Sequence, residues 1–233
     1  MLFRSAGSVL HATGTRAIER LGGLAARMPI TTAAFFVGAA AICGLPPLNG
    51  FAGEFLIYLG AFKGVLLGEA GLAVPSAALV ATLALIGGLA AACFAKAFAV
   101  VFLGASRSAD AAGAREGPAA MRWPMLALAA ACAVLGLGAF ALLPSLAPAA
   151  GIITGKPPAL FAQPLSEAGH LLLVIALASA AFILAAALAA ILRARLLRGR
   201  AVTRAATWDC GYAAPTARKI GRASCRERVY HPV

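Results

Sequence analysis

Few residues of this sequence are charged or aromatic. Charged side chains account for 12% of the 233 residues and aromatic side chains for 7%, whereas hydrophobic residues account for 62%. Ordinary soluble domains contain about 45–50% apolar residues, so a soluble core does not explain this excess. The apolar residues form long uncharged runs, which are typical of helices in a lipid bilayer. The composition therefore indicates an integral membrane protein that crosses the bilayer several times.

Motifs of catalytic chemistry are missing as well. The sequence has no glycine-rich nucleotide-binding pattern after a strand, no CxxC pair and no arrangement typical of a catalytic triad. Its 5 cysteines and 3 histidines show no spacing typical of metal ligands. Nothing therefore supports a redox or hydrolytic centre, and we expect no cofactor and no metal site in this chain.

The positive net charge of +12 does not indicate a nucleic-acid-binding protein. Such a protein carries its basic residues as a stripe on a soluble face. Here the arginines lie at the ends of apolar runs, as the positive-inside bias of membrane proteins places them. We therefore expect contact with the lipid bilayer and none with nucleic acid. Five arginines after the last apolar run predict a cytoplasmic C-terminal end: Arg193, Arg195, Arg198, Arg200 and Arg204.

The apolar runs predict an all-α, polytopic transmembrane helix bundle of about five hydrophobic helices with one broken helix region. The N-terminal residues lack the features of a signal peptide, and we expect the chain to start within a longer protein. The expected segments are 1–28, the end of a preceding helix and a loop; 30–67, a helix, a break and a second helix; 75–104, 123–144 and 168–192, three transmembrane helices; and 193–218, a basic cytoplasmic tail.

The side of the membrane on which residues 1–28 lie depends on the broken region. Counting crossings back from a cytoplasmic C-terminal end places residues 105–122 inside, and residues 68–74 and 145–167 outside. If residues 30–67 cross the membrane twice, residues 1–28 lie outside. If they form one broken crossing, residues 1–28 lie inside.

The last residues differ abruptly in composition from the rest of the chain. The segment KIGRASCRERV, at 219–229, back-translates to a sequence that looks like a common sequencing adapter. We therefore expect residues 219–233 to be non-native and exclude them from the functional argument. The alternative is a genuine basic tail.

The segment GLPPLNG, at 44–50, is the expected break within the helical region 30–67. Pro46 and Pro47 lack an amide donor and clash with the preceding helical turn, and Gly50 follows them. Glu54 comes directly after this break. Ionisable residues inside membrane segments are functional candidates by default, and broken helices frame ion sites in transporters. We therefore expect Glu54 to take up and release protons. The alternative is that Glu54 only caps the first turn of the following helix.

Three further residues are candidates for a proton pathway, each with an alternative. Lys96 lies in an apolar helix, where it pairs with Glu54 or extends its long stem to the lipid headgroups. Tyr58 is one turn beyond Glu54, in reach of a hydrogen bond, or is an interfacial aromatic residue. His11 titrates near neutral pH, which suits a proton path, or is structural at a helix end.

Several segments of the chain resemble one family of membrane proteins. GSVLHATGTRAIERLGGLAARMP and then FFVGAAAICGLPPLNGFAGEFLIYLGAF resemble the antiporter-like membrane subunits of respiratory complex I, of Mrp-type cation/proton antiporters and of membrane-bound hydrogenases. HATGTR and TWDCGYAAPTAR are most similar to the hydrogenase-associated branch. The resemblance covers about residues 1–218.

This resemblance implies a larger subunit with two inverted five-helix units, a broken helix in each, and a chain of charged residues that carries protons along the membrane plane. Glu54 matches the charged residue of the second broken helix, and Lys96 matches a basic position in the helix that follows. The resemblance also implies two crossings in 30–67, and therefore residues 1–28 outside. The first five-helix unit is missing, so the chain is not expected to pump alone.

The predicted function follows from these points. The chain is interpreted as a fragment of a proton-translocating subunit in the bacterial inner membrane, with other membrane subunits of a hydrogenase or complex I-like assembly as partners. One alternative is a Na⁺/H⁺ antiporter subunit. The other is a membrane anchor that holds a redox arm and transports nothing.

Overall fold

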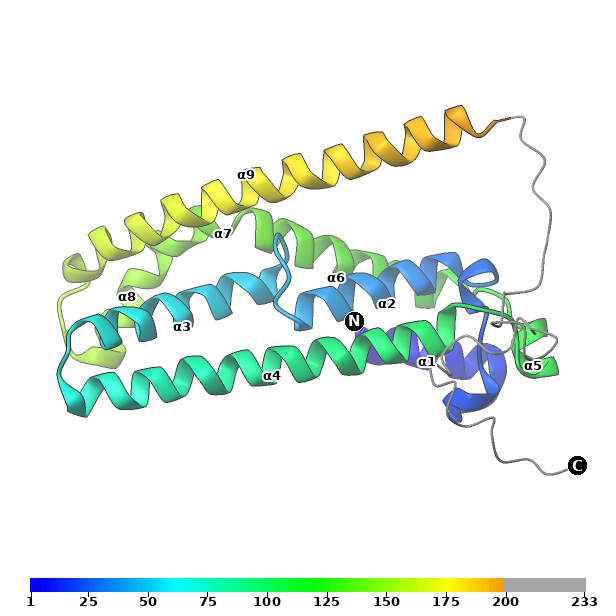
Figure 1. Ribbon diagram of the computed structural model, residues 1–233, viewed down its shortest axis with the longest axis horizontal. Helices are drawn as coiled ribbons and strands as arrows, with labels where there is room; N and C mark the ends of the chain where they lie inside the picture. Colours follow the sequence, from blue (N-terminus) through cyan, green and yellow to red (C-terminus); the bar gives the residue numbers. More distant parts are fainter. Residues whose placement is uncertain (199–233) are drawn as a thin grey trace, which may run out of the picture. The chain divides into compact units, whose positions relative to one another are not determined.

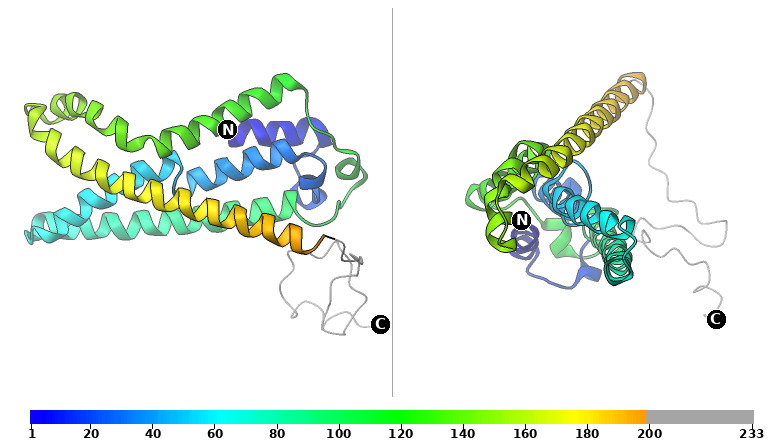
Figure 2. Two further views of the ribbon diagram at one scale, coloured as in Figure 1. Left: turned by 90° about the horizontal axis from the view of Figure 1, so that it is seen from above. Right: turned by 90° about the vertical axis from the view of Figure 1, so that its left-hand side faces the viewer.

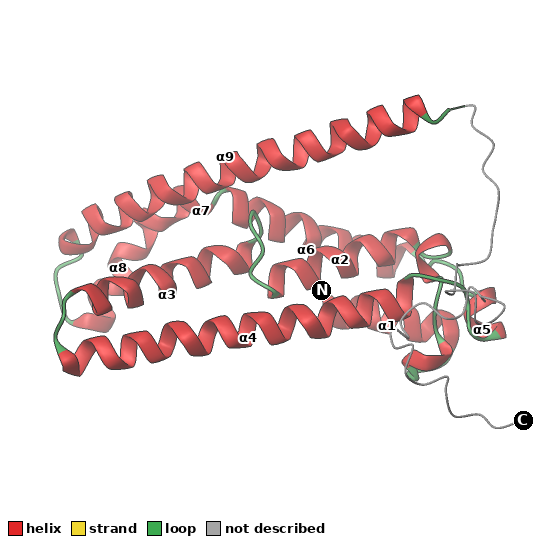
Figure 3. Cartoon of the chain, viewed as in Figure 1, coloured by secondary structure: helices red, strands yellow, loops and turns green. Residues whose placement is uncertain are grey.

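The computed structural model describes residues 1–198, and every regular element in this part is a helix (Figure 1, Figure 3). The predicted all-α class is therefore confirmed. The sequence features expected at 219–233 and at TWDCGY, and most of the basic tail at 193–218, lie outside the described residues. The elements are α1 (Leu2–Thr13), η1 (Ile18–Arg20), η2 (Leu24–Ala26), α2 (Pro29–Ile42), α3 (Asn49–Leu66), α4 (Ala70–Phe102), α5 (Ala109–Gly113), α6 (Ala119–Leu137), α7 (Ala139–Leu142), η3 (Leu143–Leu146), α8 (Ala147–Thr154) and α9 (Ala159–Leu196).

Three of these helices are long and apolar enough to cross a membrane. They are α4 with 33 residues, α6 with 19 and α9 with 38. Their large apolar side chains are mostly exposed in the isolated chain, as expected for helices that face lipid or other membrane helices. The multi-pass membrane bundle predicted from the apolar runs fits this arrangement. Helix α2 is shorter, and its 14 residues extend for about 21 Å, less than the ~30 Å of a bilayer core.

The expected helix at 123–144 is interrupted in the structure. Helix α6 ends at Leu137, and α7, η3 and α8 continue the chain to Thr154. Gly138 lies at the interruption, and Pro144 begins the next change of direction. The apolar pattern is continuous here, but glycine and proline weaken or block the helical hydrogen-bond ladder.

The chain forms two compact units, which are described separately. The first contains residues 1–36 and 93–126, and the second contains residues 37–92 and the described residues from 127 onward. In the first unit, residues of four segments share a buried core: Val9 from α1, Leu24 and Met28 from the residues that follow it, Phe102 from the end of α4, and Ala111 from α5. The ring of Phe35 lies 5.1 Å from that of Phe102 and extends this core.

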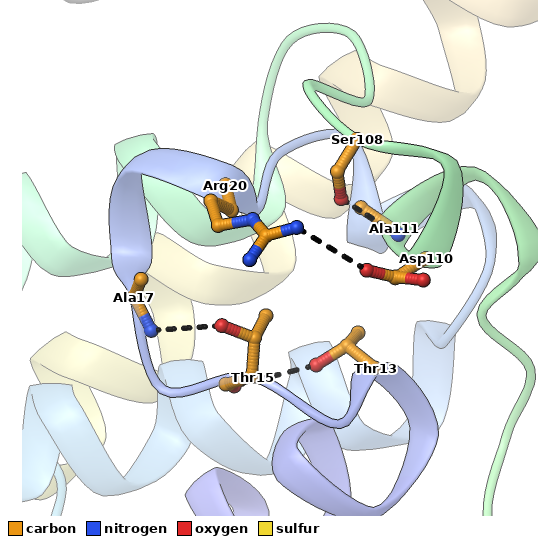
Figure 4. Close-up of polar contacts among 7 residues, drawn as sticks. All are labelled: Thr13, Thr15, Ala17, Arg20, Ser108, Asp110 and Ala111. Atoms are coloured by element: carbon orange, nitrogen blue, oxygen red, sulfur yellow. Dashed lines mark hydrogen bonds and ion pairs between the residues drawn. The ribbon is translucent and has the colours of Figure 1, made fainter.

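Polar contacts join the loop at 14–28 to the segment that follows α4. The amide of Gly23 donates to the carbonyl of Leu103 at 2.9 Å, and Arg107 donates to the carbonyl of Leu21 at 3.3 Å. Figure 4 shows Arg20 pointing toward Asp110, with 3.8 Å between the charged groups. These contacts hold the two loops together within the first unit.

Helix α4 starts after the turn at 67–69 and ends beside the loop at 14–28. Helix α2 alone is shorter than the bilayer core. The number of crossings that residues 30–67 make, one or two, stays a prediction.

In the second unit, α3 packs against the segment after α6 and against α9. Ala139, Leu143, Ala168 and Leu172 form its buried core, and aromatic and aliphatic side chains of α3 cover it. Figure 2 shows α9 as one continuous helix, with α7 and α8 beside its first part. The start of α3, which carries Glu54, is therefore held by packing within this unit.

Candidate functional site

The helix break occupies residues 43–48, between the end of α2 and the start of α3. Gly44 has a left-handed backbone with φ of 64°. Its amide donates to the carbonyl of Ala41 at 3.3 Å, and the amide of Leu45 donates to that of Ala40 at 3.1 Å. This pair of bonds is a Schellman motif, which satisfies carbonyls that a helix end otherwise leaves free. The Pro46–Pro47 bond is cis.

Two glycines of the break touch groups that leave no room for a side chain. A Cβ added to Gly44 would meet the carboxylate of Glu54, with the Cδ atom at 2.8 Å. A Cβ added to Gly50 would meet the carbonyl group of Ala41, with its carbon at 3.0 Å. The Glu54 carboxylate therefore lies directly on the backbone of Gly44, and the first turn of α3 lies against the last turn of α2.

Glu54 is half-buried, six residues into α3. The alternative expectation made it a cap for the first turn of this helix, but Leu48 is the N-cap residue and no side chain caps α3. The carboxylate lies instead beside the end of α2, where the last carbonyls give a helix its partially negative pole. A change in the charge of Glu54 would therefore change the electrostatic interaction between its carboxyl group and the backbone of the break.

The other predicted pathway residues are divided between the two units. Tyr58 shares α3 with Glu54 and is half-buried, and within residues 1–198 no hydrogen bond joins the two side chains. Lys96, in α4, and His11, in the last turn of α1, are exposed and belong to the first unit. The structure thus brings Glu54 together with Gly44, whereas Gly50, in the first turn of α3, contacts Ala41.

One acidic residue that the sequence analysis did not single out makes the most hydrogen bonds of any carboxylate in the described part of the chain. Glu116 accepts from the amide of Ile30 at 2.6 Å, and from the amide and hydroxyl of Thr31 at 3.0 and 2.9 Å. The Thr31 hydroxyl also lies 3.2 Å from that of Ser8, and both residues are fully buried. Glu116 therefore caps α2 from 85 residues away, which no local pattern indicates.

Comparison with known proteins shows which family this part of the chain is similar to. Residues 1–74, which contain the break and Glu54, match the family described as NADH:quinone oxidoreductase/Mrp antiporter, transmembrane. The resemblance found in the sequence is therefore confirmed.

Individual relatives agree with this class. The chain is similar to formate hydrogenlyase subunit 3 of Escherichia coli K12, with 40% identity over 215 residues, which cover 91% of the chain and 33% of the relative. It is similar to hydrogenase-4 component B of the same organism, with 38% identity over 163 residues, covering 70% and 24%. It is also similar to a Na⁺/H⁺ antiporter subunit of Alkalihalophilus pseudofirmus, with 47% identity over 57 residues, covering 24% and 7%. The chain thus spans about a third of the length of the first of these relatives.

Proposed function

We propose that this chain is part of a proton-translocating, antiporter-like membrane subunit, in which Glu54 takes up and releases a proton at the break between α2 and α3. The observation that supports this proposal best is the contact of the Glu54 carboxylate with Gly44 inside a membrane segment. An ionisable side chain in such a segment is costly, so its presence favours a functional role. Non-helical backbone at membrane depth persists only where protein or water satisfies it, and the break supplies such a place.

In this mechanism the break and the acid act together. When Glu54 binds a proton, a negative charge disappears beside the last carbonyls of α2, and when the proton leaves, the charge returns. The carboxylate lies on Gly44, within the segment 43–48 that joins the two helices, so this change of charge acts first on that backbone. Tyr58, Lys96 and His11 remain candidates for carrying protons to and from this acid. The redox chemistry that drives transport is assigned to other subunits.

The experiment that tests this proposal is Glu54→Gln in the intact membrane complex. Glutamine keeps the size of the side chain and removes the titratable group. Proton translocation into inverted membrane vesicles, followed with a pH-sensitive dye, should be abolished or sharply reduced relative to electron-transfer turnover.

Glu69→Gln is the matched control. Glu69 lies exposed in the turn between α3 and α4, and its variant should translocate protons normally. Unchanged translocation by the Glu54→Gln complex at normal turnover would refute the proposed role and leave the membrane-anchor alternative. That alternative predicts that removal of 193–218 disrupts assembly while Glu54 and Lys96 remain replaceable.

The orientation in the membrane is part of the proposal. The loop at 14–28 carries Arg16, Arg20 and Arg27 against Glu19, and it lies beside the segment after α4, which carries Arg107 and Arg115. Positive loops favour the cytoplasmic side. The five arginines at 193–204 favour the same side for the C-terminal end. We therefore place both on the cytoplasmic face of a bacterial inner membrane, with membrane subunits of a hydrogenase or complex I-like assembly as partners.

The second candidate function is sodium/proton antiport. The similarity to the Na⁺/H⁺ antiporter subunit of Alkalihalophilus pseudofirmus over 57 residues favours it. Transport by the intact complex in sodium-free and sodium-containing buffers separates the two functions. A requirement for sodium would favour antiport, and full translocation without sodium would favour protons as the only coupling ion.

A further inference from the structure

Gly136, near the end of α6, lies against the backbone of the helix break. A Cβ added there would meet the carbonyl oxygen of Pro47 and the carbonyl carbon of Leu48, and would lie 2.6 Å from the amide nitrogen of Asn49. Real Cβ atoms essentially never approach other atoms within 3.0 Å. Because all three groups are main-chain atoms, they cannot rotate away as a side chain can. Only glycine fits at position 136 with the break in this place.

The contact brings together two interruptions of helices in the second unit. Helix α6 ends at Leu137, one residue after Gly136. The amide of Gly138 still donates to the carbonyl of Val134 at 2.8 Å, and α7 starts at the next residue. The end of α6 is therefore shaped by glycine at the point where it touches residues 47–49.

Residues 47–49 lie in the chain between Gly44 and Glu54, the two residues that contact each other. On one side they continue from Gly44, on which the carboxylate lies, and on the other they lead into the first turn of α3. Gly50 is fixed against the carbonyl group of Ala41, so the break has little freedom to absorb a displacement. A shift of residues 47–49 must therefore move Gly44 relative to the Glu54 carboxylate.

We propose that Gly136 is a positioning residue for Glu54. Because it has no side chain, the backbone of residues 47–49 packs directly against α6, and this packing keeps Gly44 against the carboxylate of Glu54. Its importance for transport rests on the proposed function of Glu54, whereas its effect on the surroundings of the carboxyl group does not. A side chain at 136 displaces the break and opens the carboxyl group to reagents.

The test uses dicyclohexylcarbodiimide, which adds to a protonated carboxyl group and remains attached after the acyl group migrates from oxygen to nitrogen, so no atom is lost. The intact protein with Gly136→Ala is treated in its native membrane, and the rate of labelling at Glu54 is measured by mass spectrometry of its peptide. Labelling of Glu167, an exposed acid of α9, is the internal reference. Glu54→Gln must abolish the label at this position.

Gly87→Ala in α4 is the matched control, because a Cβ at Gly87 meets no atom within 4 Å. We expect the ratio of labelling at Glu54 to that at Glu167 to rise several-fold in Gly136→Ala and to stay unchanged in Gly87→Ala. Translocation per turnover should fall in Gly136→Ala only. An unchanged or lower labelling ratio in Gly136→Ala would overturn the positioning role.

The labelling also separates this inference from the proposed function. If Glu54→Gln still translocates protons but Gly136→Ala changes the labelling of Glu54, the transport role fails and the positioning role stands. If Glu54→Gln abolishes translocation but Gly136→Ala changes neither labelling nor translocation, the positioning role fails and the transport role stands.

A second measurement applies if the Gly136→Ala protein does not assemble. A photo-crosslinking amino acid replaces Leu48, which is half-buried in the break, while position 136 remains glycine. Illumination should join this residue to the peptide that covers 127–142. Crosslinks that form elsewhere and never to this peptide would show that α6 does not hold the break, which overturns the inference.

Discussion

Each of the two units of this chain contains an acidic residue at an end of α2, and these two residues differ in the hydrogen bonds that they accept. Glu116, in the first unit, accepts three hydrogen bonds at the start of α2. Glu54, in the second unit, lies on Gly44 after the end of the same helix, and within residues 1–198 it accepts no hydrogen bond. A carboxylate at a helix N-terminus complements free amides and the partially positive pole. The first acid holds a helix in place through its hydrogen bonds, whereas the second, which accepts none in the described part of the chain, is the acid that we propose to take up and release a proton.

The largest expected effect on stability comes from removing the first acid. Glu116→Ala leaves the amides of Ile30 and Thr31 without their acceptor, which should cost about 1–3 kcal/mol. The midpoint of thermal unfolding of the purified protein in detergent should fall clearly, and Glu116→Gln, which keeps one acceptor oxygen, should restore part of the loss.

Glu54→Ala supplies the contrast to this prediction. Because Glu54 has no hydrogen bond to lose in the described part of the chain, its variant should unfold at nearly the same temperature as the natural protein. If the two alanine variants lowered the midpoint equally, the division between a structural and a chargeable acid would be wrong.

The next effect concerns the glycine on which Glu54 lies. Gly44→Ala introduces a side chain at φ of 64°, which costs about 1–2 kcal/mol, and it also drives a methyl group into the carboxylate. Gly68→Ala carries a comparable backbone cost at φ of 73°, but a Cβ there meets nothing within 4 Å.

The comparison of these two glycine variants isolates the collision with the acid. Both should lower the unfolding midpoint, but only Gly44→Ala should reduce proton translocation per turnover in membrane vesicles. Equal translocation by the two variants would indicate that the contact between Gly44 and Glu54 does not contribute to proton transport.

The smallest effect is expected for the ion pair between Arg20 and Asp110. Their side chains are 64% and 54% exposed, and the charged groups are 3.8 Å apart. Surface pairs contribute about 0.2–1 kcal/mol. Asp110→Asn should therefore shift the unfolding midpoint by little, and less at high salt, because ions screen exposed charges. A loss as large as that of Glu116→Ala would show that this exposed pair contributes more to stability than its exposure predicts.

Local chemistry explains which features the sequence predicts. The break follows from Pro46 and Pro47, which disturb their own helix, and the candidate acid follows from a charge within an apolar run. These signals lie within about ten residues of each other and need no knowledge of the fold.

The remaining features depend on contacts between distant segments. Glu116 caps Thr31 across 85 residues, and Gly136 touches the break only because α6 packs there. The sequence pattern does not predict the end of α6 at Leu137, because the apolar residues continue through it.

The length of α9 has a consequence for where its two ends lie in a bilayer. Its 38 residues extend for about 57 Å, nearly twice the ~30 Å thickness of the hydrocarbon layer. Even a steep tilt of about 40° leaves turns at both ends in the headgroup region or beyond. Gln163 and Glu167, hydrogen-bonded at 3.2 Å, lie toward one end, and Arg193 and Arg195 lie at the other. Helix α9 is thus longer than the hydrocarbon layer is thick, and its polar residues lie near its two ends.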